Sequence, residues 1–213
     1  MPPLPRPFPR FIADSPQEGQ PYGRWEERLR DEFAKACAGH ADEAGGPLDT
    51  DTLKWFPERG WGGRVYVPVT GSGAGGDEDD AGPIEYFGWV SFERQGKREP
   101  EDLEAKADFT DVTAEDNPDW KIDLSDDVIG TWRAEGDRGG DITLVWGLPL
   151  VRGAIAVTAE LDGEVLDQAA VTDGRFTLIA VDAVRGFGDD LYLEVKLWDR
   201  LLRESASESL YAE

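Results

Sequence analysis

The sequence predicts a mainly β protein, in which a Pro-rich extended arm, one amphipathic helix and a small β-rich region precede a C-terminal β-sandwich. Three observations lead to this prediction. Seven short stretches of alternating apolar and polar residues follow one another near the C-terminus, Asp-Gly dipeptides separate three of them, and one stretch near the N-terminus has helical periodicity. We expect four parts: the arm at 1–22, the helix and small β-rich region at 23–98, an acidic bridge at 99–127 and the sandwich at 128–213.

The N-terminal arm contains seven prolines in residues 1–22. Proline fixes φ and lacks a backbone donor, so we expect an extended segment with polyproline II character. A purely solvated tail would not need the large apolar side chains interspersed among the prolines. These side chains are the predicted partner-binding residues of the arm: Leu4, Phe8, Phe11 and Ile12. The arm can lay them on a neighbouring subunit or pack them along its own domain, and the sequence leaves both possibilities open.

A helix is predicted over residues 23–38. Trp25, Leu29, Phe33 and Cys37 recur every four residues, which places them on one face of a helix. Side chains of opposite charge occur four residues apart on the other faces and support the same assignment. We expect the apolar stripe to pack in the core of the N-terminal half.

Two strands are predicted after the helix, at 64–70 and 84–94. The second has aromatic residues on both faces, so it should be covered on both sides. The loop between the strands contains the spacing G-x-G-x-x-G at residues 71–76, which in nucleotide-binding proteins precedes a helix. Here four acidic residues, 77–80, and then a strand follow instead. We therefore expect a hairpin connection and no phosphate site.

The C-terminal part is predicted to hold seven short strands. The Asp-Gly dipeptides at 162–163 and 173–174 are strong hairpin signals, so the third, fourth and fifth strands are expected to form a three-stranded meander. The number and spacing of the strands favour an immunoglobulin-like sandwich. The expected strands are 128–134, 141–147, 153–161, 164–171, 175–181, 190–198 and 203–211.

The net charge of −23 arises from 45 acidic and 22 basic residues. Such a surface repels phosphate, so we expect no direct nucleic-acid binding and no membrane binding. The acidity is consistent with solubility or salt adaptation, with attraction to a basic partner, or with mimicry of nucleic acid. No apolar stretch approaches the roughly 20 residues of a membrane span, and the N-terminus has no apolar signal core. We expect no signal peptide and a cytoplasmic location, or incorporation into a cytoplasmically assembled particle.

Cys37 and His40 are the only residues of their types. Their scarcity excludes an internal disulfide and the common Cys/His zinc sites. The acidic runs lack the residue spacing of a calcium loop, and no pair of carboxylates stands out among so many. The sequence therefore predicts no catalytic residue, no metal site and no cofactor.

These observations favour a non-catalytic structural or protein-interaction protein, an accessory subunit of a larger homo- or hetero-oligomeric assembly that uses its N-terminal arm. The alternative is a carbohydrate-binding module in which exposed Trp55, Trp61 and Trp89 stack on sugar rings, whereas core packing is the other role open to these aromatic residues. A second alternative is an acidic decoy that binds a basic partner.

Overall fold

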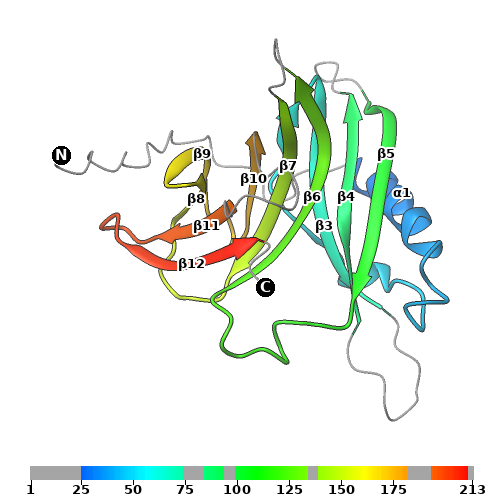
Figure 1. Cartoon of the computed structure of the whole chain (residues 1–213). Coiled ribbons are helices and arrows are strands. Elements are labelled where there is room, and N and C mark those ends of the chain that lie inside the picture. The colour runs from blue at the N-terminus through cyan, green and yellow to red at the C-terminus, as the bar shows by residue number, and fades with distance from the viewer. Residues whose placement is uncertain (1–24, 74–83, 94–98, 134–138, 182–192, 211–213) are drawn as a thin grey trace, which may run out of the picture. The chain divides into compact units, whose positions relative to one another are not determined.

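The computed structural model describes residues 25–73, 84–93, 99–133, 139–181 and 193–210. These residues are mainly β, which confirms the predicted fold class at that level, and they divide between Trp120 and Lys121 into two compact units (Figure 1). The predicted arm, with Leu4, Phe8, Phe11 and Ile12, lies outside the described residues. So does the acidic run at 77–80.

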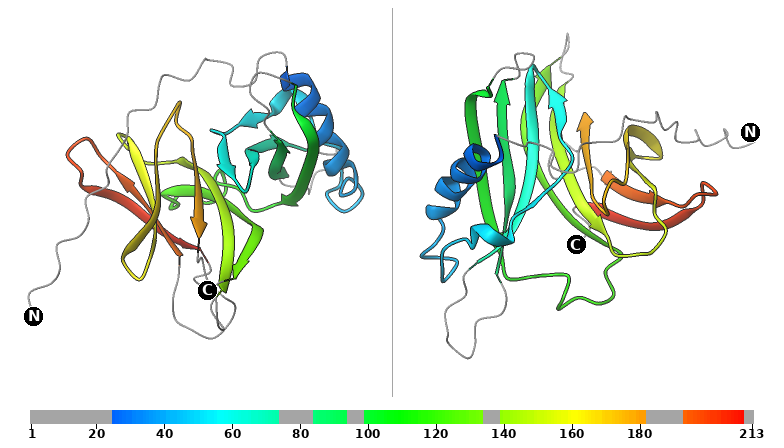
Figure 2. Two further views of the ribbon diagram at one scale, coloured as in Figure 1. Left: turned by 90° about the horizontal axis from the view of Figure 1, so that it is seen from above. Right: turned by 180° about the vertical axis from the view of Figure 1, so that it is seen from behind.

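The first unit consists of one helix, α1 (Glu26–Ala38), and one antiparallel sheet of five strands. The strand order is β1-β3-β4-β5, and β2 also pairs with β3. The helix lies across one face of this sheet (Figure 2). A short 3-10 helix, η2 (Thr50–Thr52), precedes the first strand. The strands are β1 (Lys54–Trp55), β2 (Arg59–Trp61), β3 (Arg64–Ser72), β4 (Glu85–Glu93) and β5 (Glu101–Thr110).

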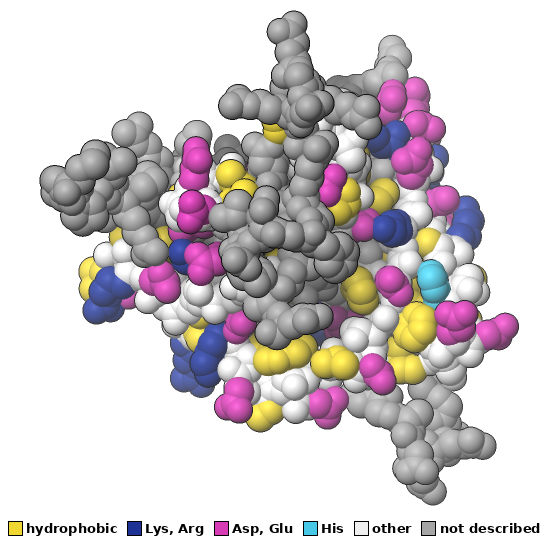
Figure 3. Space-filling view, viewed as in Figure 1, with side chains coloured by type: hydrophobic (Ala, Val, Ile, Leu, Met, Phe, Trp, Pro, Cys, Tyr) yellow, Lys and Arg dark blue, Asp and Glu magenta, His cyan; other side chains and the backbone are white. Residues whose placement is uncertain are grey.

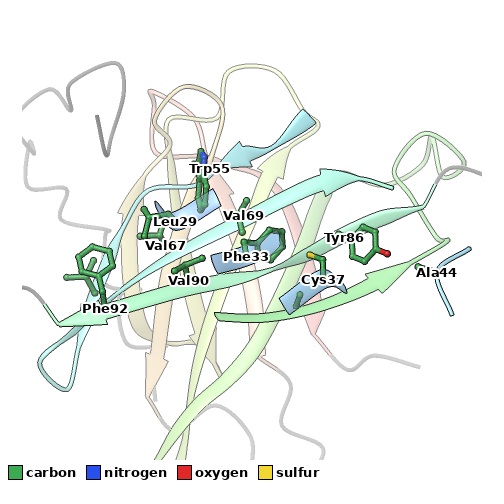
Figure 4. Close-up of a cluster of buried hydrophobic side chains, with 12 residues drawn as sticks. Leu29, Phe33, Cys37, Ala44, Trp55, Val67, Val69, Tyr86, Val90 and Phe92 are labelled. Atoms are coloured by element: carbon green, nitrogen blue, oxygen red, sulfur yellow. The ribbon is translucent and has the colours of Figure 1, made fainter. Parts of the chain in front are cut away.

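The apolar stripe of α1 forms the core of the first unit, as its four-residue repeat predicts. Leu29, Phe33 and Cys37 are buried against side chains from the strands, including Val67 and Tyr86 (Figure 4). Burial of each large apolar side chain contributes about 1.5–3 kcal/mol, so this face anchors the helix to the sheet. At 13 residues α1 is too short to cross a membrane, and the described residues hold no other candidate span.

Strands β3 and β4 form the predicted hairpin. They pair antiparallel from Arg64 to Ser72, and the amide of Gly73 donates to the carbonyl of Ile84 at 2.9 Å. Gly71, the first glycine of the G-x-G-x-x-G spacing, lies within β3, where a Cβ atom would come 2.9 Å from the side chains of Leu48 and Leu53. The absence of a side chain at Gly71 is therefore explained by packing.

The backbones of β4 and β5 leave no room for a side chain at Gly88. A Cβ atom at this position would overlap the backbone carbonyl oxygen of Lys106 on β5. Gly88 pairs with Val69 on one side and with Ala107 on the other, so it lies in the middle of the sheet. Only glycine allows this spacing of the two backbones.

The structure divides residues 99–127 differently from the predicted acidic bridge. Its first half is β5, the edge strand of the first sheet, and its last six residues begin the first strand of the second unit. Alternate residues of β5, among them Leu103, Ala105 and Ala107, pack on the helix-covered core. The sequence prediction treated 99–127 as a bridge, because the acidic residues between these apolar ones hide the alternation.

The second unit is a β-sandwich of seven strands, as the strand count predicts. One sheet has the order β10-β7-β6 and the other the order β12-β11-β8-β9. Apolar side chains of both sheets form the core between them, with Val145, Val157 and Phe176 completely buried. The strands are β6 (Ile122–Arg133), β7 (Gly139–Pro149), β8 (Ala156–Leu161), β9 (Glu164–Ala170), β10 (Phe176–Val181), β11 (Leu193–Trp198) and β12 (Glu204–Leu210).

The prediction of a three-stranded meander is wrong. The turn at 162–163 does join a β8–β9 hairpin, and both its residues have positive φ, as a type I′ turn requires. The second Asp-Gly turn, at 173–174, has the same backbone but is closed only by a single bridge between Thr172 and Arg175. After this turn the chain crosses to the other sheet, where β10 pairs with β7. In this position the side chains of Phe176 and Leu178 on β10 are buried in the core between the two sheets. A turn signal specifies the chain reversal but not the partner of the next strand.

The free edge of β10 is capped by a side chain of the opposite sheet. The amide of Ile179 donates to Oδ2 of Asp167 on β9 at 2.8 Å. A carboxylate therefore takes the place that a further strand would occupy beside this amide.

Candidate functional site

The three tryptophans proposed to stack on sugars lie on two faces of the first sheet. Trp55 pairs with Val69 and is only 8% exposed in the core beneath α1. Trp61 is 37% exposed, and Trp89 is half-buried with its ring edge-on to Tyr66 at 5.4 Å. Trp61 and Trp89 share the face opposite the helix, because they pair with residues four apart on β3, about 13 Å along the strand. A sugar-stacking role would have to rest on these two.

Cys37, the single cysteine, is held in its protonated form. Its side chain is 1% exposed, and this burial raises the pKa of the thiol from 9.0 to about 12, although a backbone hydrogen bond acts in the opposite direction. The nearby His40 donates its backbone amide to the carbonyl of Cys37 at 2.9 Å, and its ring lies tilted against Phe109 at 6.0 Å. A thiol that is protonated at neutral pH is a poor nucleophile.

We expect Cys37 of the native protein to be unreactive toward Ellman's reagent at pH 8 over a period in which the urea-unfolded protein reacts completely. Because the folded pKa lies above the unfolded one, the native state retains the thiol proton longer, and stability should fall as the pH rises from about 9 to about 12. Urea denaturation across this pH range measures the loss. A Cys37→Ala variant should lose that part of the pH dependence, and equal reactivity of folded and unfolded protein would contradict the prediction.

A buried ion-pair cluster lies on the outer face of the second sheet of the sandwich. Lys196 on β11 is 3% exposed, and its Nζ lies 2.8 Å from carboxylate oxygens of both Glu160 and Glu194. The hydroxyl of Thr158 donates to Glu160 at 3.0 Å and accepts from the indole N–H of Trp198 at 2.9 Å. The cluster links β8 to β11 by side chains as well as by backbone.

The pKa of Lys196 is raised despite its burial. Burial is the largest single effect and lowers the pKa, but hydrogen bonds and charge attraction from Glu160 and Glu194 together outweigh it. Lys196 therefore carries its charge at neutral pH, so it forms an ion pair between β11 and β8 and cannot act as a general base. The described residues also contain no group of three or more His, Cys, Asp or Glu that could hold a metal ion.

One end of the second unit exposes an unusual set of side chains. The amide of Ile155 donates to the carbonyl of Trp198, and the carbonyl of Ile155 accepts from the amide of Val171, both at 2.9 Å. These hydrogen bonds join the connection before β8 to the end of β11 and to the connection after β9. Three connections, which we call the loop end, meet at this point: residues 150–155, 171–175 and 199–203. The loop end exposes four aliphatic side chains: Leu150 (42%), Ile155 (36%), Leu201 (70%) and Leu202 (37%).

Asp199 fixes the shape of the third of these loops. Its carboxylate accepts from the amides of Leu201 and Arg203 at 2.8 and 3.0 Å, and from the Arg203 guanidinium at 2.9 and 2.7 Å. Hydrogen bonds from the backbone and then the side chain of Arg203 hold the pKa of Asp199 below its usual value. Leu202 has a φ of 56°, rare for a residue with a side chain, and its amide donates to the carbonyl of Asp199 at 2.9 Å. The tip is thus ordered before any partner binds.

The loop end is basic in a strongly acidic protein. It contains four arginines and two aspartates, a net charge of +2, whereas the whole chain carries −23. In Figure 3 the tip of the β11–β12 hairpin, at the left edge of the view, shows apolar and basic side chains next to each other. The arginines are Arg152, Arg175, Arg200 and Arg203.

Comparison with protein-family models, with curated proteins and with solved structures finds no significant match. The site is therefore interpreted from its own residues.

Sequence reasoning missed the loop end. One signal was available, because residues 200–203 read Arg-Leu-Leu-Arg, a basic and apolar run in an acidic chain. The other two loops lie about 25 and 50 residues away in the sequence and meet it only through the order of strands in the two sheets. No local pattern specifies that order.

Proposed function

We propose that this protein is a non-catalytic structural or protein-interaction protein, an accessory subunit of a larger assembly, and that the loop end is one of its binding surfaces. The observation that supports this is the concentration of four exposed aliphatic side chains in two of the three adjacent loops, 150–155 and 199–203. Single exposed apolar residues are common on any protein, but a cluster of them marks an interaction surface. Arginine, which is enriched in protein interfaces, occurs in each of the three loops.

Two groups that could support catalysis are held in inactive forms. The thiol of Cys37 is protonated, and the amine of Lys196 is charged and paired with two carboxylates. The thiol therefore serves core packing, and the amine serves to connect neighbouring strands. This supports a binding role over an enzymatic one.

We also propose that the second unit is an immunoglobulin-like sandwich. Counting β6 to β12 as its seven strands, one sheet holds the first, second and fifth, and the other holds the third, fourth, sixth and seventh. A constant-type immunoglobulin domain differs from this only in that its fourth strand lies beside the fifth. The connections between strands two and three and between six and seven meet at one end, which is where antibody variable domains carry binding loops. This likeness of fold supports the loop end as a binding surface by analogy.

The carbohydrate-binding alternative has weaker support. Trp55 is buried in the core, and Tyr66, which lies between the other two candidates on the same face, is only 6% exposed. A sugar-binding platform needs aromatic rings that are open to solvent. The protein-interaction proposal does not require any of these buried rings to become exposed.

A photo-crosslinking amino acid placed at position 201 tests the proposal in cells of the source organism. We expect a discrete protein adduct from position 201, because the Leu201 side chain is 70% exposed at the tip of the loop end. The matched control is position 164, an exposed residue at the start of β9, at the opposite end of the same sandwich, which should give no adduct.

Equal yields from the two positions, or no adduct from position 201, would contradict a binding role for the loop end. Deletion of residues 1–22 separates the loop end from the predicted arm. If the arm alone holds the partner, the adduct at position 201 should disappear in the deletion variant; if the loop end binds directly, the adduct should persist at reduced yield.

A further inference from the structure

We propose that the loop end of one molecule binds a defined acidic surface on the first unit of a second copy of this chain. The inference rests on the proposed interaction role of the loop end and adds the identity of the partner. The surface, which we call the acidic strip, spans residues 99–120 and contains nine acidic residues against one basic residue, Lys106. The acidic residues are Glu99, Glu101, Asp102, Glu104, Asp108, Asp111, Glu115, Asp116 and Asp119.

Some carboxylates of the acidic strip remain exposed although they form ion pairs with arginines of the same unit. Its N-terminal half is β5, the edge strand of the first sheet. Arg28 pairs with Glu99 at 3.2 Å, and Arg64 pairs with Asp102 at 2.7 Å and with Glu104 at 3.4 Å. Even so, the Asp102 and Glu104 side chains remain 63% and 61% exposed. These carboxylates therefore have room to accept further positive charge.

The loop end supplies the complementary chemistry. Its arginines Arg152 and Arg200 match the carboxylates of the strip in charge, and its aliphatic side chains can pack on Val112, which is 52% exposed within the strip. Two molecules that each carry −23 repel each other, but at 0.15 M salt this repulsion is screened beyond about 8 Å. Contacts at hydrogen-bond distance between loop end and strip are screened much less. Local attraction should therefore prevail at physiological salt.

A contact between two different patches of one chain is heterologous, and such contacts continue from copy to copy unless they close into a ring. The two surfaces are different patches of one chain, so a pair joined by one such contact still has one free loop end and one free strip. The loop end has 16 residues, fewer than the roughly 20–30 per side of a standard stable interface, so each contact should be weak. The average size of the particles should rise steadily with concentration and not level off at a dimer.

Sedimentation velocity of the full chain at 0.15 M salt, from micromolar to near-millimolar concentration, tests the inference. The wild-type sedimentation coefficient should rise with concentration. The loop-end variant Arg152→Glu/Arg200→Glu and the strip variant Glu104→Lys/Asp108→Lys should each weaken association about tenfold or more. An equimolar mixture of the two variants should restore it, because each reversed surface then meets a complementary one.

A charge-matched control is Lys35→Glu/Lys54→Glu, which changes the net charge as the loop-end variant does but lies outside both surfaces. It should associate like the wild type. A wild-type protein that stays monomeric throughout, a control that weakens association as much as the loop-end variant, or a variant mixture that stays dissociated would each overturn the inference.

The crosslink at position 201 keeps this inference distinct from the proposed function. An adduct of two copies, twice 23.5 kDa, supports both. An adduct with a different polypeptide, formed by a monomeric protein, overturns the inference and leaves the proposed function in place. Sedimentation of the monomer with phosphatidylserine vesicles, lost in the loop-end variant, would overturn the inference in favour of a membrane surface.

Discussion

Replacing Lys196 by methionine should lower the free energy of unfolding by about 3–5 kcal/mol, which is the usual effect of removing one partner of a buried ion pair. Lys196 is 3% exposed and Glu160 is 2% exposed, so the substitution leaves the Glu160 carboxylate buried, and among the described residues the hydroxyl of Thr158 is its one remaining hydrogen-bond partner. Glu194 is affected less, because its side chain is 36% exposed and solvent can replace the amine. Urea denaturation followed by tryptophan fluorescence measures the change.

The double variant Lys196→Met/Glu160→Leu is the decisive control. Removing both charges removes the buried carboxylate, so the double variant should recover most of the loss and approach wild-type stability. The stabilisation should also depend on pH. Because the pKa of Lys196 is raised above 10.5, the pair stabilises the fold fully below that pH and loses its effect above it. Additive effects of the two substitutions would show that the residues do not act as a pair.

The variant Gly88→Ala should destabilise the first unit by about 3 kcal/mol or more, the upper range for forcing an extra carbon into a packed structure. The new Cβ atom would overlap the backbone carbonyl of Lys106, and a backbone cannot move aside as a flexible side chain can. Strands β4 and β5 must separate, which weakens their hydrogen bonds and the core beneath them. Urea denaturation measures the loss, and Trp89, the next residue, reports it through fluorescence.

Gly60→Ala is the matched control for this prediction. Gly60 also lies in a strand of the first sheet, but it is exposed, and a Cβ atom added there would lie 3.8 Å from its nearest neighbour, the carbonyl oxygen of Arg64. This substitution should change the free energy of unfolding by less than about 0.5 kcal/mol, as is usual for surface positions. Similar losses in both variants would show that alanine weakens these strands without any clash.

The fold could be predicted from the sequence wherever one repeat pattern decides the structure. The four-residue repeat from Trp25 to Cys37 is enough to predict the helix and its buried face, and alternation is enough to place a predicted strand on each of the seven strands of the sandwich, although the first half of β6, 122–127, was assigned to the acidic bridge. Prediction failed where the partner of a strand matters. The turn at 173–174 gives no sign that β10 leaves β9 for β7, and the acidic residues of β5 conceal a strand of the first sheet.

The candidate site was less predictable than the fold. Exposure of a tryptophan depends on which face of a strand it occupies, so Trp55 and Trp61, six residues apart, have opposite environments. The loop end depends on three connections that only the sheet order brings together, and the shape of its third loop depends on hydrogen bonds to a single carboxylate, Asp199. Such arrangements follow from tertiary structure and leave little trace in local sequence.

The carboxylate of Asp167 that caps β10 has a consequence for misfolding. Aggregates grow when a strand from another molecule adds to an open sheet edge. A strand arriving at β10 would have to displace Asp167 from the amide of Ile179, whereas β5 ends the first sheet with no strand beside it among the described residues. If the protein is held at high concentration, an Asp167→Ala variant should therefore form fibrous aggregates faster than the wild type, because the amide of Ile179 is then open to a strand from another molecule.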